Sequence, residues 1–183
     1  MNSIYQLFSL LQFLTILILL PKYYANTYNL TIPDDGYKLN EINECIKQLS
    51  LKYNNINIFV NVNTFSEEIN GSLTLQIPDN TNVSLIGKPT IITYPIRTFY
   101  FIIEFNEYNN QTFTIENFTF NKYISDRAEL STLFFVLAKQ PYFNILLKNC
   151  IFNESNTNIL TFNSIYSIPY DKYQIVFDSC HFK

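Results

Sequence analysis

The residue types that could do chemistry are few in this chain, and they are widely separated in the sequence. His181 is the only histidine, and there are three cysteines. A nucleophile–base pair or a metal site needs several such groups held in a fixed mutual geometry. Asp34 and Asp35 are adjacent carboxylates that could suggest acid–base chemistry, but they precede a helical pattern, where carboxylates cap helices. We therefore predict no catalytic, cofactor-binding or metal-ligating residue and lean against an enzyme.

The cysteines offer one candidate covalent link, between Cys150 and Cys180. They occupy equivalent positions in two repeated segments, and stacked strands about 4.8 Å apart bring Cα atoms within disulfide range. A secreted chain would meet oxidising conditions. The alternative is a pair of buried thiols, because side chains stacked in one column point in parallel. Cys45 lies on an apolar helical stripe and is expected in the core.

Two kinds of side chain suggest contact with sugars. Six Asn-X-Ser/Thr sequons are candidate glycosylation sites, namely Asn29, Asn70, Asn82, Asn110, Asn117 and Asn153. A set of tyrosines could form a sugar-binding platform or pack loops instead, namely Tyr94, Tyr100, Tyr108, Tyr123, Tyr142, Tyr166, Tyr170 and Tyr173.

The composition excludes several function classes. Hydrophobic residues make up 48% of the 183 residues and charged residues 15%, which is too apolar for a disordered chain. The net charge is -3 and the 12 basic residues are scattered, so we predict no nucleic-acid binding. The three glycines are isolated, which excludes a glycine-rich phosphate loop.

The beginning of the chain has the features of a targeting segment. Residues 7–20 form an apolar run closed by Pro21 and Lys22, and Ala25 is a small residue suited to a cleavage site. We predict a signal peptide over residues 1–25 and a secreted protein. The alternative is an uncleaved membrane anchor over residues 4–20.

The rest of the chain changes from a helical to a strand period. Leu39, Ile42, Cys45, Ile46 and Leu49 recur at spacings of three and four, which predicts a helix over residues 38–53. From residue 56 onward, apolar residues alternate with polar ones in short segments separated by turn residues, which indicates strands. We therefore divide the chain into an N-terminal segment with a cap helix (26–57) and a region of strands (58–183).

The opening of this region resembles the pectin-lyase-like parallel β-helix proteins. Asp34-Asp35-Gly36 and one amphipathic helix precede strand segments at residues 58–65, 73–77, 82–87 and 90–92. In that family a helix plugs the first coil and the next strand leads into repeated coils, so the resemblance implies a right-handed parallel β-helix. Active carboxylates and basic residues lie on later coils in the enzymes of this fold, so no catalytic residue is transferred.

Internal repeats support the same fold. Segments 113–120, 145–152 and 175–182 align without gaps, and stacked coils place equivalent residues in columns. We predict inward columns beginning at Phe113, Ile115 and Phe120, and an outward charged column at Glu116. After a bend at Asn117, Asn149 and Ser179, the inward positions resume at Phe118, Cys150 and Cys180. The competing fold is a β-sandwich, which would show hairpin turns at short spacing.

The sequence narrows the function only to a class. We expect a secreted or cell-surface glycoprotein with an adhesion, recognition or structural role, in contact with carbohydrate or another protein. The alternative is a polysaccharide lyase- or hydrolase-like fragment without its catalytic coils. No capping segment follows the third repeat, so we expect an uncapped C-terminal end that could support self-association.

Overall fold

The structure is a computed structural model that describes residues 26–61, 72–93, 100–106, 111–123, 132–155, 158–164 and 174–183. Two sheets account for most of these residues. Sheet A runs in the order β1 (Thr27–Ile32), β2 (Asn55–Val60), β4 (Asn82–Thr93), β6 (Gln111–Asn121), β8 (Phe143–Lys148) and β11 (Ile175–Asp178). Two short strands, β9 (Ile151–Asn153) and β12 (His181–Phe182), extend it. Sheet B contains β3 (Ser72–Ile77), β5 (Tyr100–Phe105), β7 (Thr132–Ala138) and β10 (Asn158–Ser164).

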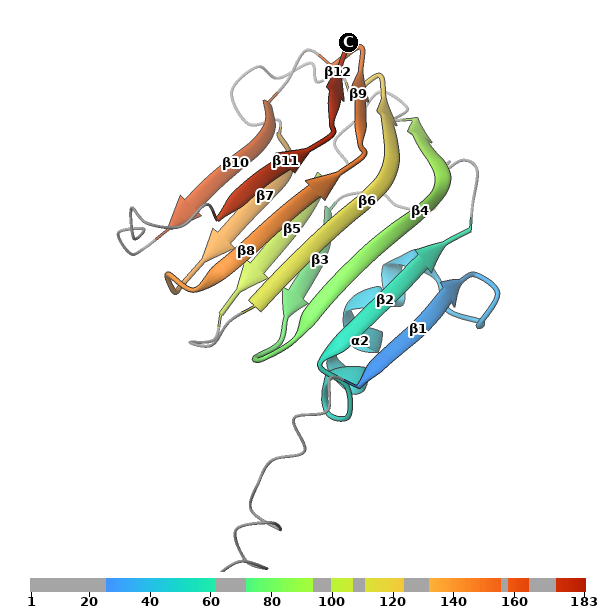
Figure 1. The fold of residues 1–183 in the computed structure, drawn as a ribbon, viewed down its shortest axis with the longest axis vertical. Coiled ribbons are helices and arrows are strands. Elements are labelled where there is room, and N and C mark those ends of the chain that lie inside the picture. Colours follow the sequence, from blue (N-terminus) through green and yellow to red (C-terminus); the bar gives the residue numbers. More distant parts are fainter. Residues whose placement is uncertain are drawn as a thin grey trace, which may run out of the picture.

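The chain passes from one sheet to the other and returns one strand further along, as Figure 1 shows. Every strand pair of the two sheets is parallel. The result is a right-handed parallel β-helix of about four turns, which confirms the predicted fold. A sandwich of antiparallel hairpins is excluded, since the described strands pair only in parallel.

The predicted columns are confirmed residue by residue. Phe120 pairs with Phe152, and Phe152 with Phe182. The three rings stack face to face, with centroids 5.3 Å and 5.2 Å apart. The other repeated positions pair in the same register, including the outward column of Glu116, Lys148 and Asp178. Parallel stacking in register therefore explains why the segments repeat.

The bends between strands have the backbone conformation that the sequence predicted. Asn117, Asn149 and Ser179 all have positive φ, at 63°, 51° and 55°. Asparagine adopts this left-handed conformation more readily than most residues, because its short polar side chain can bond locally. After each bend the inward phase resumes, so that Phe118 and Cys150 are buried.

One coil turns differently, at Gly87. Its register with the next coil shifts between Ile86 and Thr90. A Cβ atom on Gly87 would lie 2.5 Å from the backbone oxygen of Asn117, so only glycine fits. The insertion also changes which side chains face inward: Ile92 is buried, whereas Ile91 is 44% exposed. Ile91 therefore faces outward.

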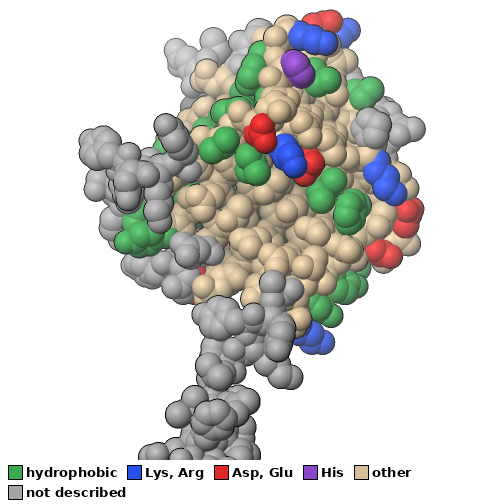
Figure 2. All heavy atoms as spheres, in the orientation of Figure 1, with side chains coloured by type: hydrophobic (Ala, Val, Ile, Leu, Met, Phe, Trp, Pro, Cys, Tyr) green, Lys and Arg blue, Asp and Glu red, His purple; other side chains and the backbone are tan. Residues whose placement is uncertain are grey.

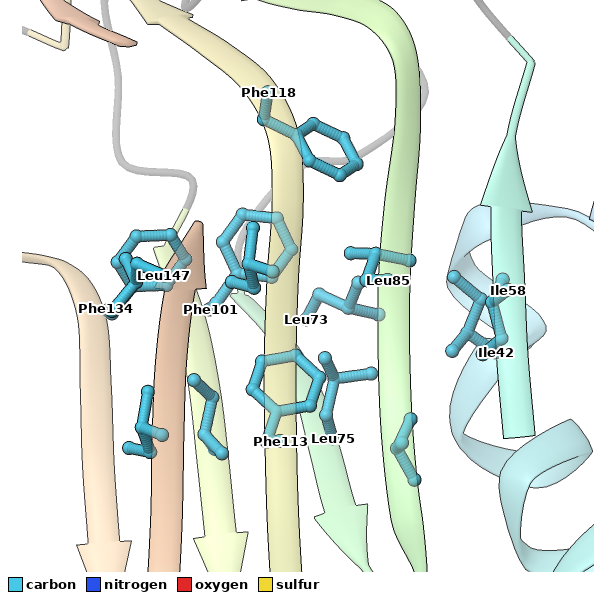
Figure 3. Close-up of a cluster of buried hydrophobic side chains, with 14 of the residues drawn as sticks. Ile42, Ile58, Leu73, Leu75, Leu85, Phe101, Phe113, Phe118, Phe134 and Leu147 are labelled. Atoms are coloured by element: carbon cyan, nitrogen blue, oxygen red, sulfur yellow. The ribbon is translucent and has the colours of Figure 1, made fainter. Parts of the chain in front are cut away.

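The N-terminal helix is shorter than predicted and takes the place of a strand. α2 (Ile42–Ser50) follows a 3-10 turn at Leu39–Glu41, in contrast to the predicted 38–53. It lies beside the outer edge of β3, where Asn43 Oδ1 accepts a hydrogen bond from the amide of Gln76 at 2.8 Å. Ile42 and Ile46 are fully buried, and Figure 3 shows Ile42 next to Ile58 of β2. The helix thus closes the first coil.

Asp34 and Asp35 do not cap this helix, contrary to the sequence-based expectation. Asp35 Oδ2 accepts the amide of Thr31 at 2.6 Å, and Asp34 Oδ2 accepts from Asn61 Nδ2 at 3.1 Å. Glu41 caps the start of the helical segment instead, because its Oε2 accepts a hydrogen bond from the amide of Lys38 at 3.0 Å. The two aspartates therefore hold the turn that follows β1.

β1 was not predicted, yet it is the first strand of sheet A. It pairs along its whole length with β2, from Thr27 opposite Asn55 to Ile32 opposite Val60. Leu30 and Ile32 are buried. The sheet therefore begins in the segment 26–57 that the sequence assigned to the N-terminal segment, and β2 starts before residue 58.

The core lies between the two sheets and is rich in phenylalanine. Figure 3 shows Phe113 and Phe118 of β6 directed into the same interior as Phe101 of β5 and Phe134 of β7. The rings of Phe101 and Phe134 stack at 5.3 Å. Each fully buried side chain of this size contributes roughly 1.5–3 kcal/mol, so the ladders supply the main stabilisation of the coils.

Candidate functional site

The charged side chains of sheet A form a ladder rather than a catalytic arrangement. Lys148 Nζ lies 3.4 Å from Glu116 Oε1, and Asp178 is the next residue in that column. His181 lies on β12 and is exposed. Among the described residues, no group of three or more histidine, cysteine, aspartate or glutamate side chains could hold a metal ion. The charged column therefore stabilises neighbouring coils by alternating charge.

The most regular surface of the molecule is the outer side of sheet A. Two adjacent columns carry only asparagine, threonine and serine over several coils. We call this surface the polar face; it consists of Thr27, Asn55, Asn82, Thr112 and Asn144 in one column and Asn29, Asn57, Ser84 and Thr114 in the other. Figure 2 shows this side mostly in tan, the colour shared by uncharged polar side chains and the backbone, with few charged side chains.

Hydrogen bonds along the columns hold parts of the polar face in order. Asn57 Nδ2 donates to Asn29 Oδ1 at 2.9 Å, and Asn82 Nδ2 donates to Asn55 Oδ1 at 2.8 Å. Strand geometry spaces the groups about 4.8 Å apart across coils and about 6.6 Å apart along each strand. The face is therefore a regular, uncharged array of groups that both donate and accept hydrogen bonds.

The six sequons fall in different settings. Asn29 and Asn82 lie on the polar face, while Asn117 sits at a left-handed bend. Asn153 is half-buried, and its Nδ2 donates to Asn121 Oδ1 at 3.0 Å. The remaining two candidates, Asn70 and Asn110, lie outside the described residues. Glycosylation at these sites stays a prediction.

Cys150 and Cys180 belong to a column with an unforeseen hydrogen-bonding role. Cys150 Sγ lies 3.4 Å from the Lys148 oxygen, two residues earlier, and 3.7 Å from the Ile115 oxygen. Cys180 Sγ makes the same two contacts one coil later. Thr90 does likewise with its hydroxyl, which donates to carbonyls at 3.0 and 3.3 Å. Each side chain thus satisfies carbonyl oxygens at a bend.

All three cysteines are free thiols in this structure, and Cys45 is buried in the core as predicted. The disulfide between Cys150 and Cys180 stays a prediction. Alkylation of the purified, denatured and unreduced chain decides it: three labels correspond to the three thiols, and a single label would reveal the disulfide.

The thiol of Cys150 is expected to make the fold sensitive to alkali. Burial raises the pKa of Cys150 from about 9.0 to about 12. Since the unfolded thiol ionises first, the stability from this group is present below pH 9 and is lost as the pH rises towards 12. Urea unfolding midpoints measured over this range should fall less steeply for Cys150→Ser than for the natural chain. Equal slopes would contradict the prediction.

The tyrosines do not form one platform among the residues that the structure describes. Tyr142 is 51% exposed, whereas Tyr123 is buried and donates to the backbone oxygen of Thr132 at 2.6 Å. Tyr100 is half-buried on sheet B. Tyr123 is therefore a packing residue, contrary to its inclusion in a sugar platform. Tyr94, Tyr108, Tyr166, Tyr170 and Tyr173 lie outside the described residues.

A buried glutamine cluster was missed by the sequence analysis. Gln111, Gln140 and Gln174 are buried where the chain enters sheet A. Gln140 Nε2 donates to Gln111 Oε1 at 3.1 Å, and Gln174 Nε2 donates to the backbone oxygen of Pro141. Their placement just before the repeated segments was the only available signal.

The signal-peptide prediction falls on residues 1–25, which lie outside the described residues. Within the described ranges, no helix has the length and apolar character needed to span a membrane.

Comparison with known proteins adds no family assignment. No protein-family model, curated protein or solved structure gives a significant match to this chain.

Proposed function

We propose that this chain is a secreted or cell-surface recognition protein, without catalytic activity, whose polar face binds a neutral polysaccharide. The location rests on the apolar run within residues 1–25 and on the sequons. The order of its elements supports a relationship to the pectin-lyase-like β-helix proteins, which we propose on the resemblance alone.

The polar face is the observation that carries this proposal. Amide and hydroxyl side chains can match the hydroxyl groups of a sugar, because each group both donates and accepts hydrogen bonds. The two columns carry no charged residue, so they offer nothing to neutralise a polyanion. An array that runs across several coils also suits an extended polymer better than a small molecule. We therefore favour a neutral glycan over a uronate polymer.

Removing hydroxyls from the polar face should weaken this binding. Thr112 and Thr114 lie on β6, towards the end of the face that is furthest from β1, and valine preserves their shape without the hydroxyl. Each lost hydrogen bond costs about 0.5–1.5 kcal/mol, so Thr112→Val/Thr114→Val should bind about tenfold more weakly. Co-sedimentation with insoluble cellulose and xylan measures the effect, using chain produced without N-glycans because Asn29 and Asn82 lie on the same face.

The matched control is Thr74→Val, on the outer side of β3 in sheet B. It should bind like the natural chain. Binding that is equal for all three proteins would exclude the polar face, and stronger binding to polygalacturonate than to the neutral polymers would contradict the proposed ligand class. Release of reducing or unsaturated sugars from any of these polymers would refute a non-catalytic role and favour the enzyme alternative.

A further inference from the structure

The last described coil exposes positions that are buried in every earlier coil. Among the described residues, no strand pairs with the outer side of β11, β12 or β10. Phe177 is 41% exposed, whereas Leu147, one coil earlier in the same column, is 1% exposed. Phe182 is 57% exposed, against 3% for Phe152 beneath it. These side chains continue the core columns to a surface that no described strand covers.

The backbone of β11 also offers hydrogen bonds on this side. The oxygens of Gln174 and Asp178 accept amides of the preceding coil at 2.7 Å and 2.9 Å. Because alternate residues direct their backbone groups to opposite neighbours, Ile175 and Phe177 direct theirs to the uncovered side. Such an edge can pair with another strand.

A buried side chain beside this edge also has an unpaired hydrogen-bond acceptor. Gln174 is only 7% exposed, and its Oε1 has no hydrogen-bond partner. The corresponding oxygens of Gln111 and Gln140 each accept a hydrogen bond, from Gln140 Nε2 and from the amide of Tyr142. An unpaired buried acceptor is unfavourable, so a further chain that brings a donor to this edge would stabilise the coil.

We propose that a second copy of this chain covers the last coil, through antiparallel pairing of the two β11 strands about a two-fold axis. A two-fold axis perpendicular to the sheets places the inward faces of the two β11 strands on the same side of the joined sheet, so that the two cores meet. It also closes the assembly at two copies, since each chain has one such coil.

Stacking of the last coil on the first coil of another copy is blocked in sheet B. There α2 lies beside β3, and Asn43 Oδ1 already accepts the amide of Gln76. A neighbouring copy would therefore find no strand position beside β3. Because α2 blocks this edge of the first coil, two copies can pair only through their last described coils. This favours a closed dimer over a filament.

The sequence of β11 suits self-pairing. When the free backbone groups of Ile175 meet those of Phe177 of the second copy, Val176 lies opposite its own counterpart. Apolar side chains then face one another across the pair. The two Asp178 carboxylates lie at opposite ends of the paired strands, so no like charges meet. This inference does not depend on the proposed polysaccharide binding.

Lysine at the two-fold axis should break the dimer. Sedimentation velocity of the purified chain should give a species of twice the mass of one chain, with the mass of one chain measured by mass spectrometry on the same preparation (21.6 kDa when all 183 residues are present, apart from glycans). Val176→Lys should weaken the dimer at least tenfold, because two ammonium groups would face each other. Leu146→Lys is the matched control, since Leu146 precedes Val176 in the same outward column and should leave the dimer intact.

A charge exchange separates lost pairing from lost folding. Val176→Glu should also be monomeric, and mixing it with Val176→Lys should restore a dimer containing one copy of each. A monomeric natural chain at its highest soluble concentration would overturn the proposal and indicate a different strand-bearing occupant. Open-ended filaments, a dimer that survives Val176→Lys, or variants that stay monomeric when mixed would equally overturn it.

Discussion

Phe120→Ala is expected to lower the free energy of unfolding by about 3–5 kcal/mol, the usual cost of emptying a large aromatic site in a core. Phe120 is 2% exposed and stacks on Phe152 at 5.3 Å. It also meets the ring of Phe134 edge to face at 5.4 Å, which ties sheet A to sheet B. Alanine would remove both contacts and leave a cavity between coils. Urea unfolding followed by circular dichroism measures the change.

Phe182→Ala is the matched control, because it truncates the same residue type in the same column. Phe182 stacks on Phe152 at 5.2 Å but is 57% exposed. The loss should therefore be well below that of Phe120→Ala. Equal losses at the two positions would mean that burial along the ladder does not set the stability of the coils.

Gly87→Ala is expected to lower the free energy of unfolding by about 1–3 kcal/mol, as other overpacking changes do. The added methyl group would lie 2.5 Å from the backbone oxygen of Asn117 and 3.1 Å from the side chain of Thr90. A backbone oxygen in a paired strand cannot rotate away as a side chain can. The neighbouring coil must therefore move, and the register between β4 and β6 would be disturbed.

The control for this change is Ser84→Ala, at an outward position of the same strand. Its effect should stay within about 0.5 kcal/mol, as for most surface substitutions. The same urea experiment compares the two variants. A Gly87→Ala protein as stable as Ser84→Ala would show that the coils at this bend lie further apart than the structure has them.

Much of the fold could be predicted because stacking repeats in the sequence. Inward positions of each coil must be apolar, and the bends favour residues that tolerate positive φ. The alignment of the three segments therefore predicted which residues pair between coils, and Phe120, Phe152 and Phe182 pair as expected. The predicted bends at Asn117, Asn149 and Ser179 have left-handed backbones.

The elements that were missed lie outside this repetition. β1 is a short segment whose partner, β2, is separated from it by α2, so nothing local marks it as a strand. The insertion after Gly87, which changes the alternation so that Ile92 faces inward and Ile91 outward, occurs in only one coil. Asp34 and Asp35 bind neighbouring loop and strand groups that helix-capping rules do not consider.

The candidate site was beyond sequence reasoning for a related reason. Outward residues of a strand need only be polar, so Asn57, Ser84 and Thr114 carry no individual signal. Only the stacking of the coils makes them neighbours. The buried glutamines are likewise distant in the sequence, and only the stacking of the coils brings Gln140 within hydrogen-bond distance of Gln111.

By itself, the sequence determined that this chain forms stacked parallel coils closed by one helix, because the alternation of apolar residues and their repetition at equivalent positions are local properties that each coil must satisfy to bury its core. The tertiary structure alone decided which polar side chains share a surface and how the first strand joins the sheet. Those features depend on contacts between residues far apart in the chain, for which no local pattern is required.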